Sequence, residues 1–413
     1  MRLRVPDHGR VSEFGHGQCG YVGSIPAAAD SPPPELVIAD GELRVCNAFD
    51  LAHEVDLVAV ERALRSGRTP LGGVARLHLE RQQDAIVIAN TPVTMRLGDR
   101  ALRIGEHEFR AGVYARFYAF GALTVVWTVP LPASCSLDDL ATLAVELATP
   151  SSAAALDAWA RDDAIEALAA AAAAVADRIP HEPLERLVLH AIRTFRDDVT
   201  ATQVLDHPSL APLVLGERLD FSPTVLADLR DASASYTTHD LVVVGYDQAL
   251  IYDAHNAGDI AALLEFALVQ VHELDWYDLQ LDARLSAASA AVGVAHGRSL
   301  RRRAAGGFGS APFERLRKEL LVEHMELVRV LEQVTAAVKV TDDLYYASIY
   351  HDAMRVFRAD ELIEATNRKL ELVFRTYSML GEEADSQTSH RLEWIIIVLI
   401  LFEIVMSLFD RAF

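Results

Sequence analysis

The pattern of hydrophobic and polar residues changes several times along the chain. Between residues 36 and 150, short runs of apolar residues predict strands, and apolar residues at helical spacing predict helices. The strands are expected at 84–89, 91–97 and 123–129, and the helices at 51–66 and 137–147. This part of the chain is therefore predicted to be an α+β domain.

A second mixed segment follows an alanine-rich one. Residues 151–180 carry few large side chains, and we expect a helical connector there. Within 181–258, the spacing of apolar residues predicts an amphipathic helix over 183–199, and two apolar runs on either side of Asp247 and Gln248 predict a hairpin. This segment is predicted to form a second α+β unit.

The chain beyond residue 259 has the spacing of long helices. They are expected at about 259–293, 313–339 and 344–380. The last two repeat apolar residues about every 3.5 positions, at Phe313, Leu316, Leu320, Leu327, Val330 and Val334, and at Ile349, Ala353, Val356, Ile363, Leu370 and Tyr377. We expect long antiparallel, coiled-coil-like helices, which pack either within one chain or between the copies of a homo-oligomer.

The last apolar block lies near the C-terminus. Residues 395–402 and 404–409 are almost entirely apolar, and Glu403 separates them. A helix over 392–409 is about 27 Å long, close to the hydrocarbon core of about 30 Å. We therefore expect a membrane anchor over 391–410, in which Glu403 is protonated or faces a partner helix. The alternative is a buried helix in the core of an oligomer.

The predicted fold class is α+β, with two mixed α/β units followed by long antiparallel helices and a C-terminal transmembrane helix. The expected parts are a flexible, Gly- and Pro-rich arm over 1–35, the first α+β domain over 36–150, the connector over 151–180, the second unit over 181–258, the long-helix region over 259–390 and the anchor over 391–410.

A motif accompanies the C-terminal apolar block. It consists of Arg391, Leu392, Glu393, Trp394 and, within the block, Glu403. The motif resembles the C-terminal signature of the required-for-meiotic-nuclear-division (YagE-type) family, a domain of unknown function. The helices expected over 313–380 and the aromatic and aliphatic residues of 117–127 are similar to that family as well. The resemblance implies a bacterial member of a family whose eukaryotic relatives are organellar membrane proteins that support mitochondrial translation.

Composition and charge narrow the possible partners. The 413 residues are 51% hydrophobic, which indicates a folded protein, and the net charge is −21. This charge argues against sequence-independent nucleic-acid binding by the whole surface, because neutralising phosphates requires a dense set of Lys and Arg. Cys19, Cys46 and Cys135 form no metal-type pair and fit a reducing compartment. Since no signal peptide is apparent, we expect a single-pass bacterial inner-membrane protein with most of its mass in the cytoplasm.

One dense basic cluster stands out in this acidic chain. It comprises Arg298, Arg301, Arg302 and Arg303, and glycine-rich residues follow it at 306–309. We expect a loop between two long helices, where arginines bind lipid headgroups, RNA phosphates or an acidic subunit. The alternative is a helix end at which the arginines complement the helix dipole.

Other candidate sites are weaker. The helix expected from residue 259 carries Glu265, His272, Glu273, Asp275 and Asp278. These groups ligate metals in other contexts, but they are spread around the helix, so we expect a solvated face. Residues 15–20 match G-x-G-x-x-G, yet prolines follow where a dinucleotide site needs a helix. We predict no catalytic residue, metal or cofactor.

Three functional hypotheses remain. The first is an oligomeric scaffold, held at a membrane by the C-terminal tail, with an unknown protein partner and no catalytic site. The second is a soluble or peripheral enzyme that uses a cleft between the α+β units, and polar residues converging in a pocket would favour it. The third is membrane-tethered RNA or ribosome binding through Arg298–Arg303.

Overall fold

The structure is a computed structural model. It describes residues 35–51, 54–66, 72–76, 91–104, 107–175, 181–304 and 343–372, together with Met325, Arg375, Ile396, Ile397, Leu399 and Ile400. The expected arm before Glu35, the glycine motif at 15–20, the strand at 84–89 and the helix over 313–339 lie outside these residues, except for Met325.

A mixed sheet of nine strands forms the centre of the described structure, in the order β2-β3-β4-β5-β1-β6-β9-β8-β7. The strands are β1 (Ile38–Asp50), β2 (Gly72–Arg76), β3 (Val93–Ile104), β4 (His107–Phe117), β5 (Ala122–Pro130), β6 (His181–Phe195), β7 (Ser233–Ala234), β8 (Leu241–Val244) and β9 (Gln248–Tyr252). Neighbours in this sheet are antiparallel, except for the parallel pair β6 and β9. The expectation of a mixed α/β protein is therefore confirmed.

Strand β1 crosses the middle of the sheet and pairs on both of its edges. Val45 lies opposite Trp127 of β5 and opposite Val188 of β6. Successive side chains of a strand point to opposite faces of a sheet. Val45 accordingly packs in one hydrophobic cluster with Trp127, whereas Cys46 packs in another cluster on the other face. Both faces of β1 are thus buried, which explains its run of apolar residues.

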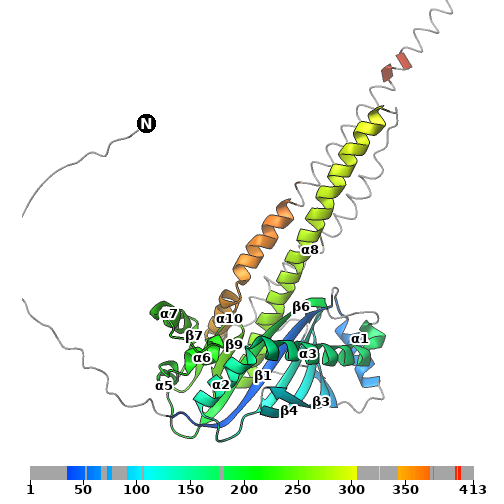
Figure 1. Ribbon diagram of the computed structural model, residues 1–413. Coiled ribbons are helices and arrows are strands. Elements are labelled where there is room, and N and C mark those ends of the chain that lie inside the picture. Colours follow the sequence, from blue (N-terminus) through cyan, green and yellow to red (C-terminus); the bar gives the residue numbers. More distant parts are fainter. Residues whose placement is uncertain are drawn as a thin grey trace, which may run out of the picture. The chain divides into compact units, whose positions relative to one another are not determined.

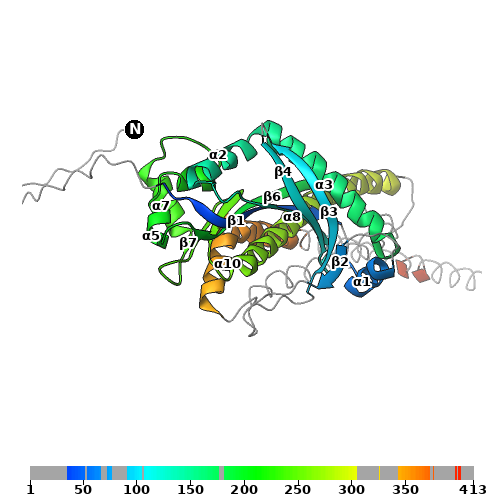
Figure 2. The ribbon, with the colours of Figure 1, turned by 90° about the horizontal axis from the view of Figure 1, so that it is seen from below.

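Helices cover both faces of this sheet. They are α1 (Leu57–Ser66), α2 (Leu137–Leu147), α3 (Pro150–Ala170), α4 (Ala172–Val175), α5 (Ala201–Leu205), α6 (Leu210–Leu215), α7 (Pro223–Asp231), α8 (Ala257–Ala304) and α10 (Leu344–Val356), and residues 359–372 continue as helix after α10. One hydrophobic cluster joins α8 and α10 to one face, while α3, α2 and α6 pack on the other. Figure 2 shows α2 and α3 on one side of β1 and β6, with α10 on the opposite side.

The helical residues after 343 run beside α8 and in the same direction (Figure 1). Ile349 is buried in the cluster that contains α8, Ile363 packs against Leu274, and Lys369 pairs with Asp278 at 2.8 Å. The apolar seam of the predicted helix 344–380 therefore packs within one chain, as far as it is described. Three successive antiparallel helices would give such a parallel pair, but the expected middle helix is not among the described residues, so that order stays a prediction.

A helix was predicted over 183–199, but most of these residues belong to strand β6. Leu187, Val188, Ala191 and Ile192 have helical spacing, which is why the sequence suggested a helix. In β6, Leu187 and Ala191 instead pack on the side of α8, while Val188 and Ile192 belong to the clusters on the other face. A strand buried on both faces is apolar at consecutive positions, so its sequence imitates a buried helix.

The two predicted α+β units share one sheet. Strands β1 to β5 come from the first unit and β6 to β9 from the second, and the β1–β6 pairing joins them. Two local predictions are confirmed, the hairpin of β8 and β9 and the helix α2. The start of α2 is defined by a capping box, in which Ser136 and Asp139 each accept a hydrogen bond from the other's backbone N–H.

The predicted membrane anchor is corrected by the structure. Among the described helices, none is both long enough and apolar enough to cross a membrane. The longest, α8, carries charged residues along its length, from Asp259 to Arg303. This finding overturns the predicted C-terminal transmembrane helix and the inner-membrane localisation that depended on it. Of residues 391–410, only Ile396, Ile397, Leu399 and Ile400 are described, and all four are helical and more than half exposed.

Candidate functional site

A buried carboxylate fastens α8 to the sheet. Glu265 is 2% exposed, and one of its oxygens accepts hydrogen bonds from the hydroxyls of Tyr118 at 3.0 Å and Thr124 at 2.6 Å. Its other oxygen pairs with the Arg116 guanidinium. Because a charge-assisted network already occupies both oxygens, Glu265 is a structural anchor and not a ligand-binding group.

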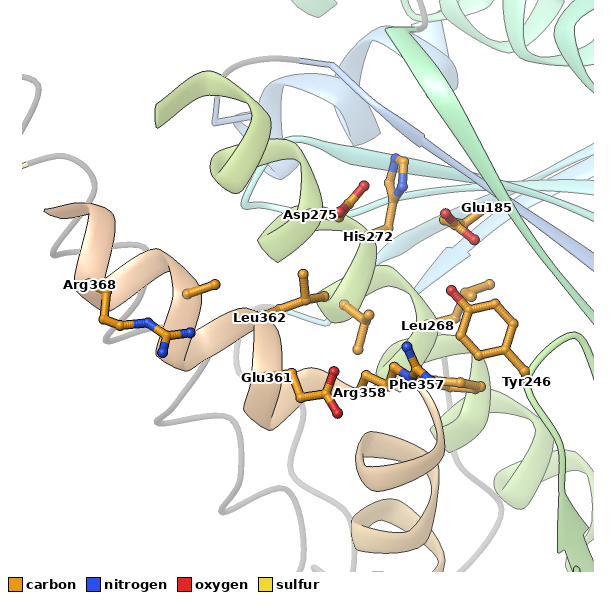
Figure 3. Close-up of a pocket in the computed structure, with 12 residues that line it drawn as sticks. Glu185, Tyr246, Leu268, His272, Asp275, Phe357, Arg358, Glu361, Leu362 and Arg368 are labelled. Carbon is orange, nitrogen blue, oxygen red and sulfur yellow. The ribbon is translucent and has the colours of Figure 1, made fainter. Parts of the chain in front are cut away.

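A pocket of about 490 Å³ lies one turn further along α8. Helix α8 contributes Leu268, Val271, His272 and Asp275, whose spacing of three or four residues places them on one face. The other lining residues are Glu185 near the start of β6, Tyr246 in the turn between β8 and β9, and, from the segment that follows α10, Phe357, Arg358, Glu361, Leu362, Ala365 and Arg368. Figure 3 shows how these four parts of the chain surround the pocket.

His272 is a buried polar side chain without partners. It is 0% exposed, and neither ring nitrogen makes a hydrogen bond with any described residue. Burial lowers its pKa to about 4, so the imidazole is neutral at pH 7 and offers one donor and one acceptor. In Figure 3 its ring lies between Asp275 and Glu185. An unsatisfied buried polar group costs about 1–3 kcal/mol, so the presence of one in a folded protein calls for an explanation.

The Glu185 carboxyl titrates near neutral pH. Burial, followed by the negative charges of Asp275 and Asp247, raises its pKa to about 7. The Tyr246 hydroxyl points toward Glu185 in Figure 3, and the pKa of Tyr246 is itself raised by burial and by the charge of Glu185. A carboxyl with a pKa near 7 both donates and accepts protons at neutral pH. This wall of the pocket is therefore suited to acid–base chemistry.

The acidic residues of α8 do not form the predicted solvated face. Glu265, His272 and Glu273 are all buried. Glu273 is 1% exposed, and burial together with the charge of Asp50 raises its pKa well above the ordinary value. Across the described parts of the chain, no group of three or more His, Cys, Asp or Glu side chains is arranged to hold a metal ion.

The basic cluster lies on a helix and not in the predicted loop. Arg298, Arg301, Arg302 and Arg303 belong to the last turns of α8, which continues to Ala304. Arginine is a good helix former and cations are favourable near a helix C-terminus, so the helix extends through them. Anion binding by these residues stays a prediction. The motif residues Arg391, Leu392, Glu393, Trp394 and Glu403 lie outside the described residues.

The sequence alone did not reveal the pocket. Glu185, Tyr246 and Arg358 come from three separate segments, and no spacing rule connects them. One signal was present in α8, where His272 and Asp275 continue the stripe that Leu268 and Val271 begin. A polar residue that continues an apolar stripe indicates either a buried hydrogen bond or a site, and none of the residues that the structure describes is a hydrogen-bond partner of His272.

The fold and the pocket define a mixed α/β protein with a polar pocket between its sheet and its long helices. Residues 40–258 match the family model described as "Uncharacterized protein MJ0711, N-terminal domain", and the chain belongs to this family. The matched region contains Glu185 and Tyr246 and ends before His272.

One relative is the uncharacterized protein MJ0711 of Methanocaldococcus jannaschii, which is 22% identical over 182 residues. The match covers 44% of this chain and 53% of the relative, so the chain spans about half the length of the curated relative it matches. No solved structure matches the chain significantly. The resemblance to the required-for-meiotic-nuclear-division family is not confirmed by these comparisons.

Proposed function

We propose that this protein binds a small molecule in the pocket beside α8 and exchanges a proton with it through Glu185. The observation that carries the proposal is the state of His272, which is fully buried at the pocket and makes no hydrogen bond with a described residue. Buried polar groups are nearly always satisfied. Neither nitrogen is exposed, so a ligand reaches the imidazole when the side chains that line the pocket move. A hydrogen bond to the imidazole would then remove the energetic penalty of the unpaired nitrogens, and this gain would add to the affinity.

Glu185 supports a chemical role beyond binding. Its pKa of about 7 follows from burial and from two neighbouring carboxylates, and general acid–base catalysts work best when their pKa is near the operating pH. Perturbed carboxyls in concave sites are more often functional than carboxyls on open surfaces. These features favour the enzyme hypothesis in its acid–base form, with a pocket between the sheet and α8 in place of the predicted cleft between two domains.

The other hypotheses stay proposals without support from a described residue. Self-association as a scaffold and RNA or ribosome binding through Arg298–Arg303 rest on sequence patterns alone. The finer assignment to the required-for-meiotic-nuclear-division family is likewise a proposal, because it rests chiefly on residues 391–403.

A thermal-shift screen of small polar metabolites against the full-length chain tests the pocket. A ligand present at 100 times its Kd stabilises the folded state by about 2.7 kcal/mol, which raises Tm by several degrees. We expect at least one compound to do so with the wild type and not with His272→Leu. The matched control is His351→Gln, because His351 is an exposed histidine on α10 and should leave binding unchanged.

Calorimetry in buffers of different ionisation heat tests the proton exchange. Near pH 7, binding at the pocket should change the protonation of Glu185, so the measured heat should depend on the buffer. Glu185→Gln should remove that dependence. A compound that binds wild type and His272→Leu equally, or a complete lack of binders, would contradict the proposed function.

A further inference from the structure

The backbone of Arg358 has a conformation that arginine rarely adopts. Its φ is 59°, and it is the one non-glycine residue with positive φ in the described part of the chain. The helix α10 ends just before it, Phe357 caps that helix, and helical residues resume at Ala359. A left-handed conformation costs a non-glycine residue about 1–2 kcal/mol. Such strain persists where the surroundings impose it, which is often at a binding site.

The guanidinium of Arg358 is uncommitted, although it lines the pocket. No hydrogen bond or ion pair to a described residue engages it. The neighbouring cations differ in this respect: Arg355 pairs with Asp352 at 3.1 Å, Arg368 with Glu364 at 3.3 Å, and Lys369 with Asp278 at 2.8 Å. An arginine that is free of partners and directed by the break in the helix is suited to a bidentate contact with a carboxylate.

The wall opposite Arg358 has the reverse charge. Glu185 and Asp275 lie there on either side of the neutral His272 (Figure 3). Glu361 also lines the pocket, three residues after Arg358, and no ion pair between the two is formed. The pKa of Tyr246 responds both to Glu185, which raises it, and to Arg358, which lowers it. The charges of Glu185 and Arg358 therefore both act at Tyr246, on the wall of the pocket.

We infer that the ligand of this pocket is a small zwitterion of the amino-acid type, with its carboxylate bound by Arg358 and its ammonium group bound by Glu185 and Asp275. This inference rests on the proposed function, because it names the class of molecule that the pocket takes. Opposite charges on opposite walls of the pocket favour a ligand with one positive and one negative group over a ligand with a charge of only one sign.

The test uses the common L-amino acids as probes, with the full-length chain and isothermal titration calorimetry. Each amino acid is compared with its C-terminal amide, which keeps only the ammonium group, and with its N-acetyl derivative, which keeps only the carboxylate. We expect at least one free amino acid to bind, and each of its blocked forms to bind more weakly by about tenfold or more, since a hydrogen-bonded charge is lost.

Variants then assign the two ends of the ligand. Arg358→Gly should weaken the free amino acid by about tenfold or more and leave the amide unchanged. Glycine accepts the positive φ without strain, so this variant should keep the fold. Arg355→Gln is the matched control, because Arg355 pairs with Asp352 and is not among the residues that line the pocket, and it should bind like the wild type. Glu185→Gln should weaken the free amino acid and the amide together.

Two outcomes overturn the inference. One is that the amide binds the wild type as tightly as the free amino acid, and the other is that Arg358→Gly binds the free amino acid as the wild type does. A third outcome overturns the inference alone and leaves the broader proposal in place. If no amino acid binds while another compound binds in a His272-dependent way, the zwitterion is excluded and the proposed function stands. If nothing in either set binds, both fail.

Discussion

Two buried polar side chains on α8, Glu265 and His272, have opposite surroundings. They are seven residues apart and so lie on nearly the same face of the helix. Glu265 has three partners on β4, β5 and the turn between them, while His272 has none among the described residues. The difference shows that burial alone does not identify a site. A satisfied carboxylate holds the fold together, whereas an unsatisfied imidazole next to a cavity marks the candidate site.

The largest expected effect comes from breaking the satisfied member of this pair. Glu265→Ala should lower the free energy of unfolding by about 3–5 kcal/mol, because Arg116 would remain buried without its counter-charge. Urea denaturation at 25 °C would measure the change. The control is Glu371→Ala, which removes an exposed pair with Arg375 and should change stability by less than about 1 kcal/mol. Equal losses in the two variants would mean that the Glu265 network is not an anchor.

A smaller effect of opposite sign is expected at His272. His272→Leu should raise the free energy of unfolding by about 1 kcal/mol, since it removes two unsatisfied buried nitrogens. His190 provides the matched comparison. It is also 0% exposed, but its Nε2 lies 2.8 Å from the Gln248 side-chain oxygen. Gln248 donates its amide N–H to the Ala144 carbonyl, so its oxygen accepts the hydrogen bond from His190.

His190→Leu should therefore destabilise the fold by about 1 kcal/mol, because leaving the Gln248 oxygen without its donor costs more than removing the unpaired Nδ1 of His190 gains. The same denaturation measurement applies to both leucine variants. Destabilisation of similar size in both would show that His272 has a structural partner after all, and the contrast between the two histidines would be lost.

The smallest expected effect is a change in the pH dependence of stability. The Glu185 carboxyl has a pKa of about 7 in the folded state and 4.5 ordinarily, so between these values the folded state holds more protons than the unfolded state. Stability should therefore fall as pH rises from about 4.5 to 7. The contribution is on the order of 1 kcal/mol, because solvent screens part of it.

Glu185→Gln should remove this slope. The lowered pKa values of His190 and His272 act in the opposite sense, since they reduce stability as pH falls from 6.5 toward 4. The informative quantity is thus the difference between wild type and Glu185→Gln at each pH, in which the histidine contributions cancel. A difference that does not vary with pH would mean that Glu185 titrates in its ordinary range.

Local signals allowed part of the fold to be predicted from sequence. The spacing of apolar residues predicted the helix over 137–147, which are the bounds of α2, and the capping box of Ser136 and Asp139 explains why it begins there. The β8–β9 hairpin was visible as two apolar runs with a short turn. Strand β6 was mistaken for a helix, because burial on both faces removes the alternation that marks a strand. Whether a segment is buried on one face or two depends on distant residues.

The candidate site was beyond the reach of local patterns for the same reason. Glu185 and Arg358 line one pocket although the two positions are 173 residues apart along the chain, as the difference of their numbers shows. The number of hydrogen-bond partners that a polar side chain has depends on how the whole chain folds. The sequence analysis expected both Glu265 and His272 on a solvated face. Only the contacts with the sheet distinguish Glu265, which has partners there, from His272, which has none among the described residues.

The central position of β1 also shapes how this chain folds. One edge of β1 pairs with β5, and the other pairs with β6. Since Val45 pairs with Val188, β6 is synthesised about 140 residues after β1. Loop closure over such separations is slow, and proteins rich in distant contacts fold slowly. During synthesis, the chain up to β5 therefore presents an apolar strand with an open edge, a surface that promotes aggregation and chaperone binding until β6 closes it.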